Sequence, residues 1–152
     1  MPPASNVAPP KDDADYFGRM TRAIFAAGLN WKMIENKWPR FTEAFGAFSP
    51  SKVASMTERD IARLMKDEGI VRNEKKIRAT LHNAGEFVRV GKEFGSFKEY
   101  LQSFGRDEQK LQEDIQERFH HLGPSSARMF LWLVGHKLTP NAEEKAWMAG
   151  HH

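Results

Sequence analysis

The sequence predicts an all-α fold, a compact helical bundle, and three observations lead to this prediction. Apolar residues recur at spacings of three and four in successive short stretches, which is the period of a helix with one buried face. The stretches begin after residues that favour helix starts, and several end at a glycine. No stretch alternates apolar and polar residues for long enough to predict a strand. Short helices joined by short turns favour a globular bundle over a coiled coil.

The first two predicted helices are defined by their caps and by a proline. Asp12, Asp13 and Asp15 suit the positive end of a first helix, which Gly28 ends. A second helix starts near Asn30 and contains Pro39, where the missing backbone donor predicts a kink or a restart. The apolar residues of these two helices are Phe17, Met20, Ile24, Ala27, Trp31, Ile34, Trp38, Phe41 and Phe45.

The later helices follow the same logic. Ser49-Pro50 opens a short helical turn, with proline at the favoured first position, and Thr57 and Asp60 resemble a capping box. Asn73 caps a longer helix. Further helices are expected from Ser96, around Leu111, Ile115 and Phe119 up to the pair 122–123, over residues 124–134, and from Thr139 onward.

Composition bounds the class of protein. The chain has 152 residues, of which 40% are hydrophobic and 28% charged, as in a single domain with a core. No stretch approaches the roughly 18 apolar residues of a membrane span, and no signal peptide is seen, so we expect a soluble, cytoplasmic protein. The absence of cysteine excludes disulfides, thiolate metal sites and a cysteine nucleophile. A net charge of +3 is compatible with phosphate binding but is common among other proteins.

The two ends of the chain differ from its body. Residues 1–11 are rich in proline and poor in large apolar side chains, which predicts a disordered arm, with the helical domain over 12–150. His151 and His152 are either native or part of a tag, and no role is assigned to them.

The segment 119–128 is the first candidate functional site. A helix ends in an apolar residue and Gly123, and a new helix begins at once with the small residues Ser125 and Ser126. Free amides at such a helix start bind phosphate through hydrogen bonds and the helix dipole, and Arg128 adds positive charge. The alternative is an ordinary turn between two packed helices, with serine as a routine cap.

A basic cluster and a group of aromatic residues are the other candidates. Arg72, Asn73 and Lys76 lie at a helix start, where cations oppose the dipole, so a bound anion is one explanation and a solvated polar face is the favoured alternative. Aromatic side chains such as Phe25 and Trp31 are usually core. Trp31, beside the helix break, is the one best placed to stack on a base. No metal-binding, triad or phosphate-loop motif is present.

Taken together in order and spacing, several stretches resemble the 3-methyladenine DNA glycosylase I family of the helix-hairpin-helix superfamily. They are residues 27–31 (AGLNW), 48–54 (FSPSKVA), 69–73 (GIVRN) and 122–126 (LGPSS). The resemblance implies a DNA glycosylase-like helical fold with a helix-hairpin-helix motif. It implies that Gly123, Ser125 and Ser126 hold a phosphate and that Trp31, with Asn30 and Phe25, forms the base pocket. Arg72, Asn73, Lys76 and Arg128 are then expected to face the DNA.

The sequence also departs from this family's pattern. The family's base-binding glutamate falls on Ala23, so the catalytic residues are unknown, and the family's zinc site, with cysteine and histidine ligands, cannot be built without cysteine. No cofactor or metal is expected.

The resemblance predicts a monomeric enzyme that flips an alkylated base of the 3-methyladenine type out of double-stranded DNA and hydrolyses its N-glycosidic bond in base excision repair. Ala23 leaves open a non-catalytic DNA-binding or damage-sensing module on the same scaffold. A helical protein-interaction domain is the third alternative.

Overall fold

The computed structural model describes residues 7–28 and 30–150 of the chain, and these residues form helices and connecting turns without a strand. The predicted all-α class is therefore confirmed. The helices are α1 (Asp13–Ala26), α2 (Trp31–Ala44), the 3-10 turn η1 (Gly46–Phe48), α3 (Pro50–Ala54), α4 (Glu58–Leu64), α5 (Glu74–Phe94), α6 (Phe97–Gln102), α7 (Glu108–Arg118), α8 (Pro124–Leu133) and α9 (Ala142–Ala149).

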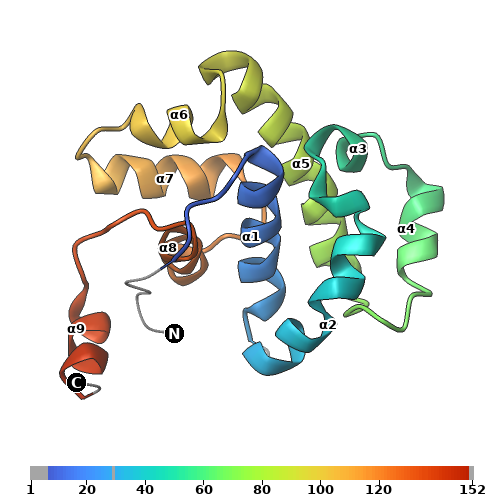
Figure 1. The fold of residues 1–152 in the computed structure, drawn as a ribbon, viewed down its shortest axis with the longest axis horizontal. Helices are drawn as coiled ribbons and strands as arrows, with labels where there is room; N and C mark the ends of the chain where they lie inside the picture. Colours follow the sequence, from blue (N-terminus) through green and yellow to red (C-terminus); the bar gives the residue numbers. More distant parts are fainter. Residues whose placement is uncertain (1–6, 29, 151–152) are drawn as a thin grey trace.

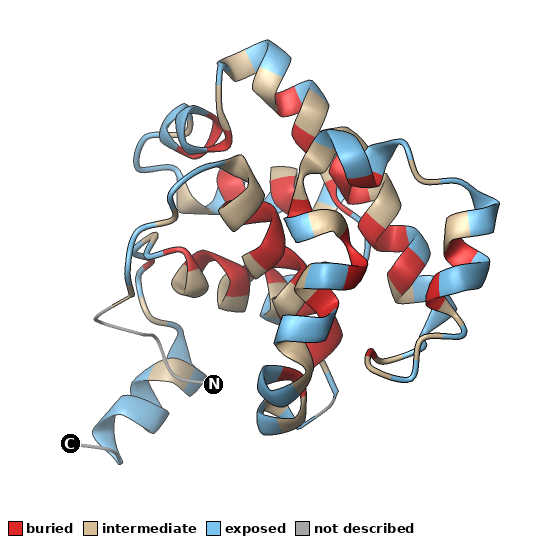
Figure 2. Cartoon of the chain, turned by 45° about the vertical axis from the view of Figure 1, so that its right-hand side comes forward, coloured by how far each residue is buried: buried red, intermediate tan, exposed pale blue. Residues whose placement is uncertain are grey.

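Helix α1 lies at the centre of the molecule (Figure 1). It packs against α2, α5 and α8, with α6, α7 and α8 on one side and α2 to α4 on the other. The long helix α5 runs behind α1 and joins the two sides. Helix α9 projects from the body and has no buried residue, as the pale colour in Figure 2 shows. Within the described residues, no helix is long and apolar enough to cross a membrane.

Aromatic side chains make up much of the core, and they form two neighbouring groups. Under α1, α5 and α6, the rings of Phe87 and Phe97 stack with centroids 4.5 Å apart, and Phe17 lies 5.2 Å from Phe87. Between α1, α2 and η1, the indole of Trp38 stacks on Phe48 at 5.1 Å. Such pairs contribute about 0.5–1.5 kcal/mol beyond the area that they bury. The fold is therefore stabilised on both sides of α1.

Most predicted helix starts agree with the structure, but the last helix begins at Ala142 and not at Thr139, because Asn141 caps it. Asp12, Asn73 and Ser96 each accept a hydrogen bond from the first turn of the helix that follows, which satisfies an otherwise free amide. Helix α2, however, continues through Pro39 to Ala44, so it does not restart at that proline; the kink, which was the other expected outcome, stays a prediction. The buried apolar face of α2 compensates for the hydrogen bond that proline cannot make.

The described part of the N-terminal arm lies against the helical domain. Residues 7–11 contain no helix or strand and no buried residue, and residues 1–6 lie outside the described residues. The carbonyl of Ala8 nevertheless accepts a hydrogen bond of 2.7 Å from the guanidinium of Arg19 on α1. This end of the arm is thus held on the surface of the domain without entering the core.

Candidate functional site

The turn between α1 and α2 presents Trp31. Gly28 has a positive φ of 76°, a conformation that glycine adopts without strain and that reverses the chain direction after α1. Asn30 then caps α2: its side-chain oxygen accepts from the amides of Lys32 at 2.8 Å and Met33 at 3.3 Å. Trp31, the first residue of α2, is half-buried and packs against the core. The cap and the glycine therefore fix the position of this indole.

Lysine 76 holds this turn from α5. Its ammonium donates to the carbonyl of Ala27 at 3.0 Å and lies 6.0 Å from the ring centroid of Phe25. Burial lowers the pKa of Lys76. Phe25 itself has no exposed surface and packs edge-on against Phe41. In the free protein, Lys76 and Phe25 thus pack on the inner side of the turn that carries Trp31 and hold it in place.

Arginine 22 occupies the space beside the indole of Trp31. Its guanidinium carbon lies 5.3 Å from the ring centroid of Trp31 and 5.3 Å from that of Trp38. Its Nε is buried and has no hydrogen-bond partner in the described residues. Burial lowers the pKa of Arg22, and the nearby carboxylate of Glu35 opposes this effect. The cation–π contacts compensate only part of the lost hydration of the guanidinium.

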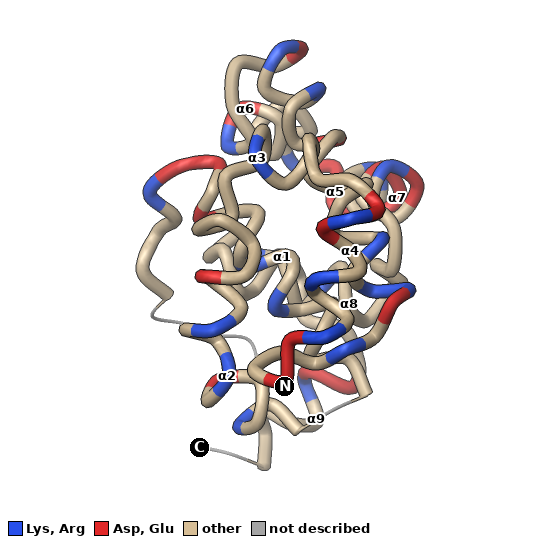
Figure 3. Tube along the Cα trace, turned by 90° about the vertical axis from the view of Figure 1, so that its right-hand side faces the viewer, with Lys and Arg blue, Asp and Glu red and all other residues tan. Residues whose placement is uncertain are grey.

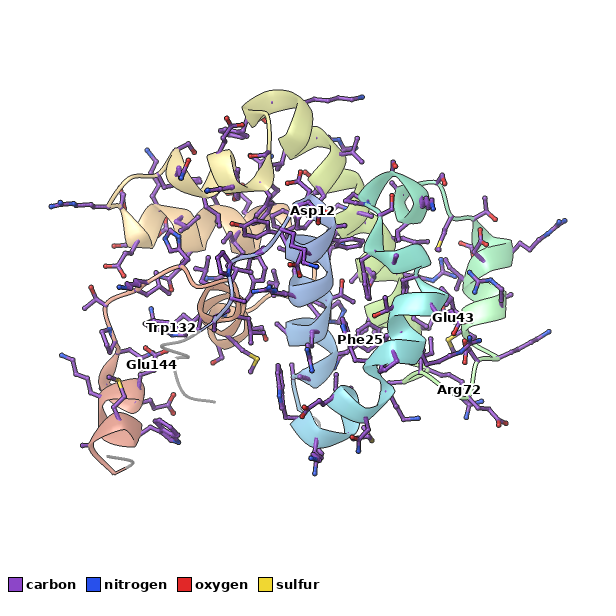
Figure 4. All side chains as sticks on the ribbon, in the orientation of Figure 1. Asp12, Phe25, Glu43, Arg72, Trp132 and Glu144 are labelled. Carbon is purple, nitrogen blue, oxygen red and sulfur yellow. The ribbon has the colours of Figure 1, made fainter. Side chains whose placement is uncertain are left out.

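A pocket of about 630 Å³ extends from Arg22 and Trp38 along α1 to the N-terminal arm. Asp12 and Asp15 on its wall are carboxylates, and Figure 4 labels Asp12 at the upper end of α1. Asp15 forms an ion pair of 3.1 Å with Arg19. Burial acts to raise the pKa of Asp15, but hydrogen bonds from the Lys11 amide and from Arg19 lower it overall. Asp15 is therefore ionised at neutral pH.

Ala23, the position of the family's base-binding glutamate, is fully buried in the core of α1. An alanine offers no hydrogen-bonding side chain, so the side of the pocket next to Arg22 gains no carboxylate from this position. No group of three or more histidine, aspartate and glutamate side chains in the described chain is placed to hold a metal ion.

The second candidate region is the hairpin between α7 and α8. Gly123 is the N-cap of α8, with no side-chain cap, and Pro124 begins the helix. Gly123 and Ser125 are exposed, and Ser126 is partly exposed. His121 has a positive φ of 61°, which is unusual for a residue with a side chain. The start of α8 is therefore open to an incoming anion.

Asparagine 83 on α5 fixes the hairpin. Its side-chain oxygen accepts from the amide of His120 at 2.8 Å, and its side-chain nitrogen donates to the carbonyl of the same residue at 3.2 Å. The rings of His82 and His120 stack with centroids 3.4 Å apart. Helix α7 ends at Arg118, earlier than the expected end at residues 122–123, and Phe119 is extended, so the backbone of His120 is free to bind Asn83. Burial, followed by the nearby His82 and His121, lowers the pKa of His120.

Asn83 is a residue that the sequence analysis missed. It is fully buried, on a helix face that also carries Ile77, Ala84 and Phe87. A carboxamide on an otherwise apolar helix face is the signal that could have revealed it, since a buried amide requires partners.

The remaining predicted DNA-facing residues lie at two separate places. Arg72 and Asn73 are exposed at the end of the α4–α5 loop. Asn73 caps α5 by accepting a hydrogen bond from the amide of Lys76 at 3.1 Å. Figure 4 places Arg72 on the opposite side of α1 from Trp132 of α8. Along the chain, positive and negative residues are interspersed (Figure 3). The structure thus separates the Arg72 region from the end of α8 that carries Trp132.

Arginine 128 is bound within the protein. Its guanidinium forms an ion pair of 2.6 Å with Glu144 of α9 and donates to Gln112 and to the carbonyl of Thr139. The indole nitrogen of Trp132 also donates to Glu144, at 3.2 Å, and Figure 4 shows these two side chains side by side. Hydrogen bonds from Arg128 lower the pKa of Glu144 to about 2. Arg128 therefore attaches α9 next to the hairpin.

Comparisons with known proteins place this architecture. The sequence model described as methyladenine glycosylase matches residues 7–131. Over 78 residues the chain is 36% identical to DNA-3-methyladenine glycosylase 1 of Escherichia coli (strain K12) and 35% identical to DNA-3-methyladenine glycosylase of Haemophilus influenzae. These alignments cover 51% of this chain but only 42% of either relative, so the match spans less than half the length of both.

Solved structures extend the likeness over most of the chain. A 3-methyladenine DNA glycosylase I variant in complex with 3-methyladenine superposes with a TM-score of 0.76 at 30% identity, covering 86% of this chain and 82% of that one. A variant of 3-methyladenine DNA glycosylase I from Staphylococcus aureus gives 0.77 at 31% identity, with coverage of 86% and 82%. The fold is therefore that of the all-helical DNA glycosylases. Within this class, the chain belongs to the methyladenine glycosylase family.

Proposed function

We propose that this protein binds double-stranded DNA, flips an altered base of the 3-methyladenine type into the pocket beside Trp31, and hydrolyses its N-glycosidic bond in base excision repair. The observation that carries the proposal is the capped, half-buried Trp31 at the start of α2, in contact with Arg22 on the wall of a pocket of about 630 Å³. Trp31, Asn30 and Phe25 are not themselves on that wall. The names of the relatives and the family membership of the chain support it.

In this proposal the two candidate regions have different tasks. The exposed start of α8, with Gly123, Ser125 and Ser126, binds a backbone phosphate through its free amides. Trp31 stacks on the flipped base, and Asn30 and Phe25 support it. Arg72 and Asn73 lie on the DNA-facing surface, and Lys76 and Arg128 lie behind it. Stacking of this kind contributes about 1–3 kcal/mol per base.

The hydrolysis breaks the bond between the sugar C1′ and the base nitrogen. The electron pair of that bond goes to the base, and the oxygen of a water molecule bonds to C1′. A methylated adenine is cationic in the nucleotide and leaves as a neutral base, so little acid catalysis is needed. The proton that the attacking water loses goes to solvent, because Asp15, the ionised carboxylate on the pocket wall, already accepts hydrogen bonds from Arg19 and from the Lys11 amide.

The test is the release of 3-methyladenine from N-methylated duplex DNA, measured by chromatography. We expect release by the purified protein in the presence of a chelator, and a loss of about 10- to 100-fold in Trp31→Ala, from the stacking energy. Trp147→Ala on α9 removes an indole far from α2 and serves as the matched control. No release at high enzyme concentration by a protein with a helical circular dichroism spectrum would sink the enzyme proposal.

A non-catalytic DNA-binding or damage-sensing module is the second candidate, and the buried Ala23 in place of a carboxylate favours it. Both candidates require DNA binding at the hairpin. We expect Gly123→Asp to weaken duplex binding at least tenfold, because a carboxylate there repels phosphate. Unchanged affinity and salt dependence in this variant would contradict both. A monomeric state, testable by sedimentation, and a cytoplasmic location belong to the proposal as well.

A further inference from the structure

The feature of the pocket that the proposed chemistry does not use is Arg22. Of the two arginines on its wall, Arg19 is matched by Asp15 and donates to the carbonyls of Ala8 and Leu133. Arg22 instead has a buried Nε without an acceptor among the described residues. Leaving a buried donor unsatisfied costs about 1–3 kcal/mol. A group kept in this state inside a pocket is suited to an acceptor that a ligand brings.

The position of Arg22 relates it directly to the base. Its guanidinium carbon lies 5.3 Å from the centroid of each of the two indoles, Trp31 and Trp38. The guanidinium lies over the face of Trp31, so a planar base that enters on this face either displaces it sideways or stacks on its plane, as arginine does with nucleic-acid bases. In either arrangement the edge of the base is within reach of the N–H donors of Arg22.

The charges around Arg22 define the base that it accepts. A guanidinium has donors only, and it binds two adjacent acceptors in a bidentate manner. Ala23, its neighbour on α1, has no carboxylate to neutralise it, and Glu35, which faces it from α2, is exposed. At the donors of Arg22, the positive charge therefore favours a base edge with acceptors and no charge over the edge of a cationic methylated base.

We propose that Arg22 is the base-reading residue of this pocket and that the pocket takes, as a further substrate, an uncharged purine with a carbonyl at C6, for which hypoxanthine is the simplest probe. The O6 and N7 atoms of such a purine are the adjacent acceptors that arginine binds in a bidentate manner. Adenine derivatives present an amino group in place of O6. This inference rests on the proposed glycosylase function and names the class of base that the same site accepts.

Arg22 also suits the chemistry of an uncharged base. When the C1′–N9 bond of hypoxanthine breaks, the electron pair leaves with the base, water adds its oxygen to C1′, and the proton of that water ends on the base. Negative charge develops on the base before the proton arrives. A guanidinium at O6 and N7 stabilises this charge, and this contribution increases as the bond breaks.

The test compares two duplexes, one with a single hypoxanthine opposite thymine and one with a single 3-methyladenine, under single-turnover conditions. We expect wild-type protein to release hypoxanthine above the spontaneous rate. Arg22→Leu should release it about 10- to 100-fold more slowly, the range for one bidentate arginine–base contact. The same variant should release 3-methyladenine at least as fast as the wild type, because a repelling charge is gone. Arg22→Lys, which keeps the charge without the planar fork, should not restore hypoxanthine release.

Arg106→Leu is the matched control, since Arg106 is exposed on the turn between α6 and α7, far from α2 in Figure 1. Equal losses on both substrates in Arg22→Leu would mean a structural role and would overturn the inference while leaving the glycosylase proposal intact. Release of hypoxanthine alone would leave the inference standing and overturn the alkylated-base proposal. If wild type releases neither base, preferential binding of the hypoxanthine duplex, lost in Arg22→Leu, is the deciding measurement, and no preference overturns the inference.

Discussion

Two arginines, Arg22 on α1 and Arg128 on α8, show how the same side chain is used in two ways. Arg128 on α8 has a carboxylate, a carboxamide and a carbonyl as acceptors, and its side chain is only 14% exposed. Arg22 on α1 lies over two indoles, and its buried Nε has no acceptor. Arg128 therefore stabilises the structure of the free protein, whereas the binding capacity of Arg22 is left for a ligand.

The regions around these arginines differ in the same sense. The α8–α9 region is held by polar contacts, because α9 has no buried residue of its own and depends on Glu144. The α1–α2 region is held by aromatic packing, in which Trp38, Phe41 and Phe48 stack. Replacing each arginine by an apolar side chain should thus change stability in opposite directions.

The largest effect is expected for Arg128→Met. The substitution removes the ion-pair partner of Glu144 and the Arg128 donor to the carbonyl of Thr139, so the free energy of unfolding should fall by about 2 kcal/mol. Urea unfolding measures this fall, and amide hydrogen exchange in α9 should accelerate with it. Unchanged exchange in α9 would show that other contacts hold the helix.

Acid should reproduce part of that effect. Arg128 lowers the pKa of Glu144 to about 2, below the ordinary 4.5, so ionised Glu144 stabilises the fold fully above about pH 4.5. This contribution should be lost as the pH falls through about 2. Hydrogen exchange of α9 measured against pH tests the expectation, and Glu144→Gln should abolish the pH dependence. A pH dependence that persists in this variant would assign it to another group.

A smaller change of opposite sign is expected for Arg22→Met. The substitution removes a buried donor without an acceptor and keeps the apolar stem, so stability should rise by about 1 kcal/mol. Urea unfolding of the variant and of the wild type gives the difference. A loss of stability would mean that the cation–π contacts with Trp31 and Trp38 outweigh the missing hydrogen bond.

The smallest effect concerns the hairpin turn. His121 adopts a φ of 61°, which costs free energy for a residue with a side chain, so His121→Gly should stabilise the protein by about 0.5 kcal/mol. Glu117→Gly in the exposed face of α7 should instead destabilise it by about 1 kcal/mol. Thermal unfolding of both variants checks the pair, and destabilisation by both would show that the His121 side chain contributes to the turn.

The sequence predicted the helix class and most helix starts, because these depend on neighbouring residues. Asn30 and Asn73 cap their helices through contacts two or three residues away. The last helix was expected from Thr139 but begins at Ala142. Asn141 and Glu144 form a capping box at this start. Local chemistry of this kind can be read directly from the order of residues.

The site was predicted less completely, because its contacts join distant parts of the chain. The sequence drew attention to Trp31 and to the Gly123 hairpin, but not to Arg22 or Asn83. Arg22 contacts the indole of Trp31 only when α2 folds back on α1, and Asn83 binds His120 only when that residue is brought to α5. The role of Arg128 was likewise not visible, since its partner Glu144 lies in a separate helix.

The hydrogen bond between Arg19 and the N-terminal arm affects the size of ligand that the pocket admits. Helices form most of the pocket wall, but its outer part is residues 7–11, which hydrogen bonds from Arg19 to Ala8 and from the Lys11 amide to Asp15 tie to α1. A hydrogen bond of this kind contributes about 1–3 kcal/mol, far less than unpacking a helix. The outer wall of the pocket can therefore move without unpacking a helix. Shortening the chain before Lys11 should broaden the range of bulky base adducts that the pocket accepts.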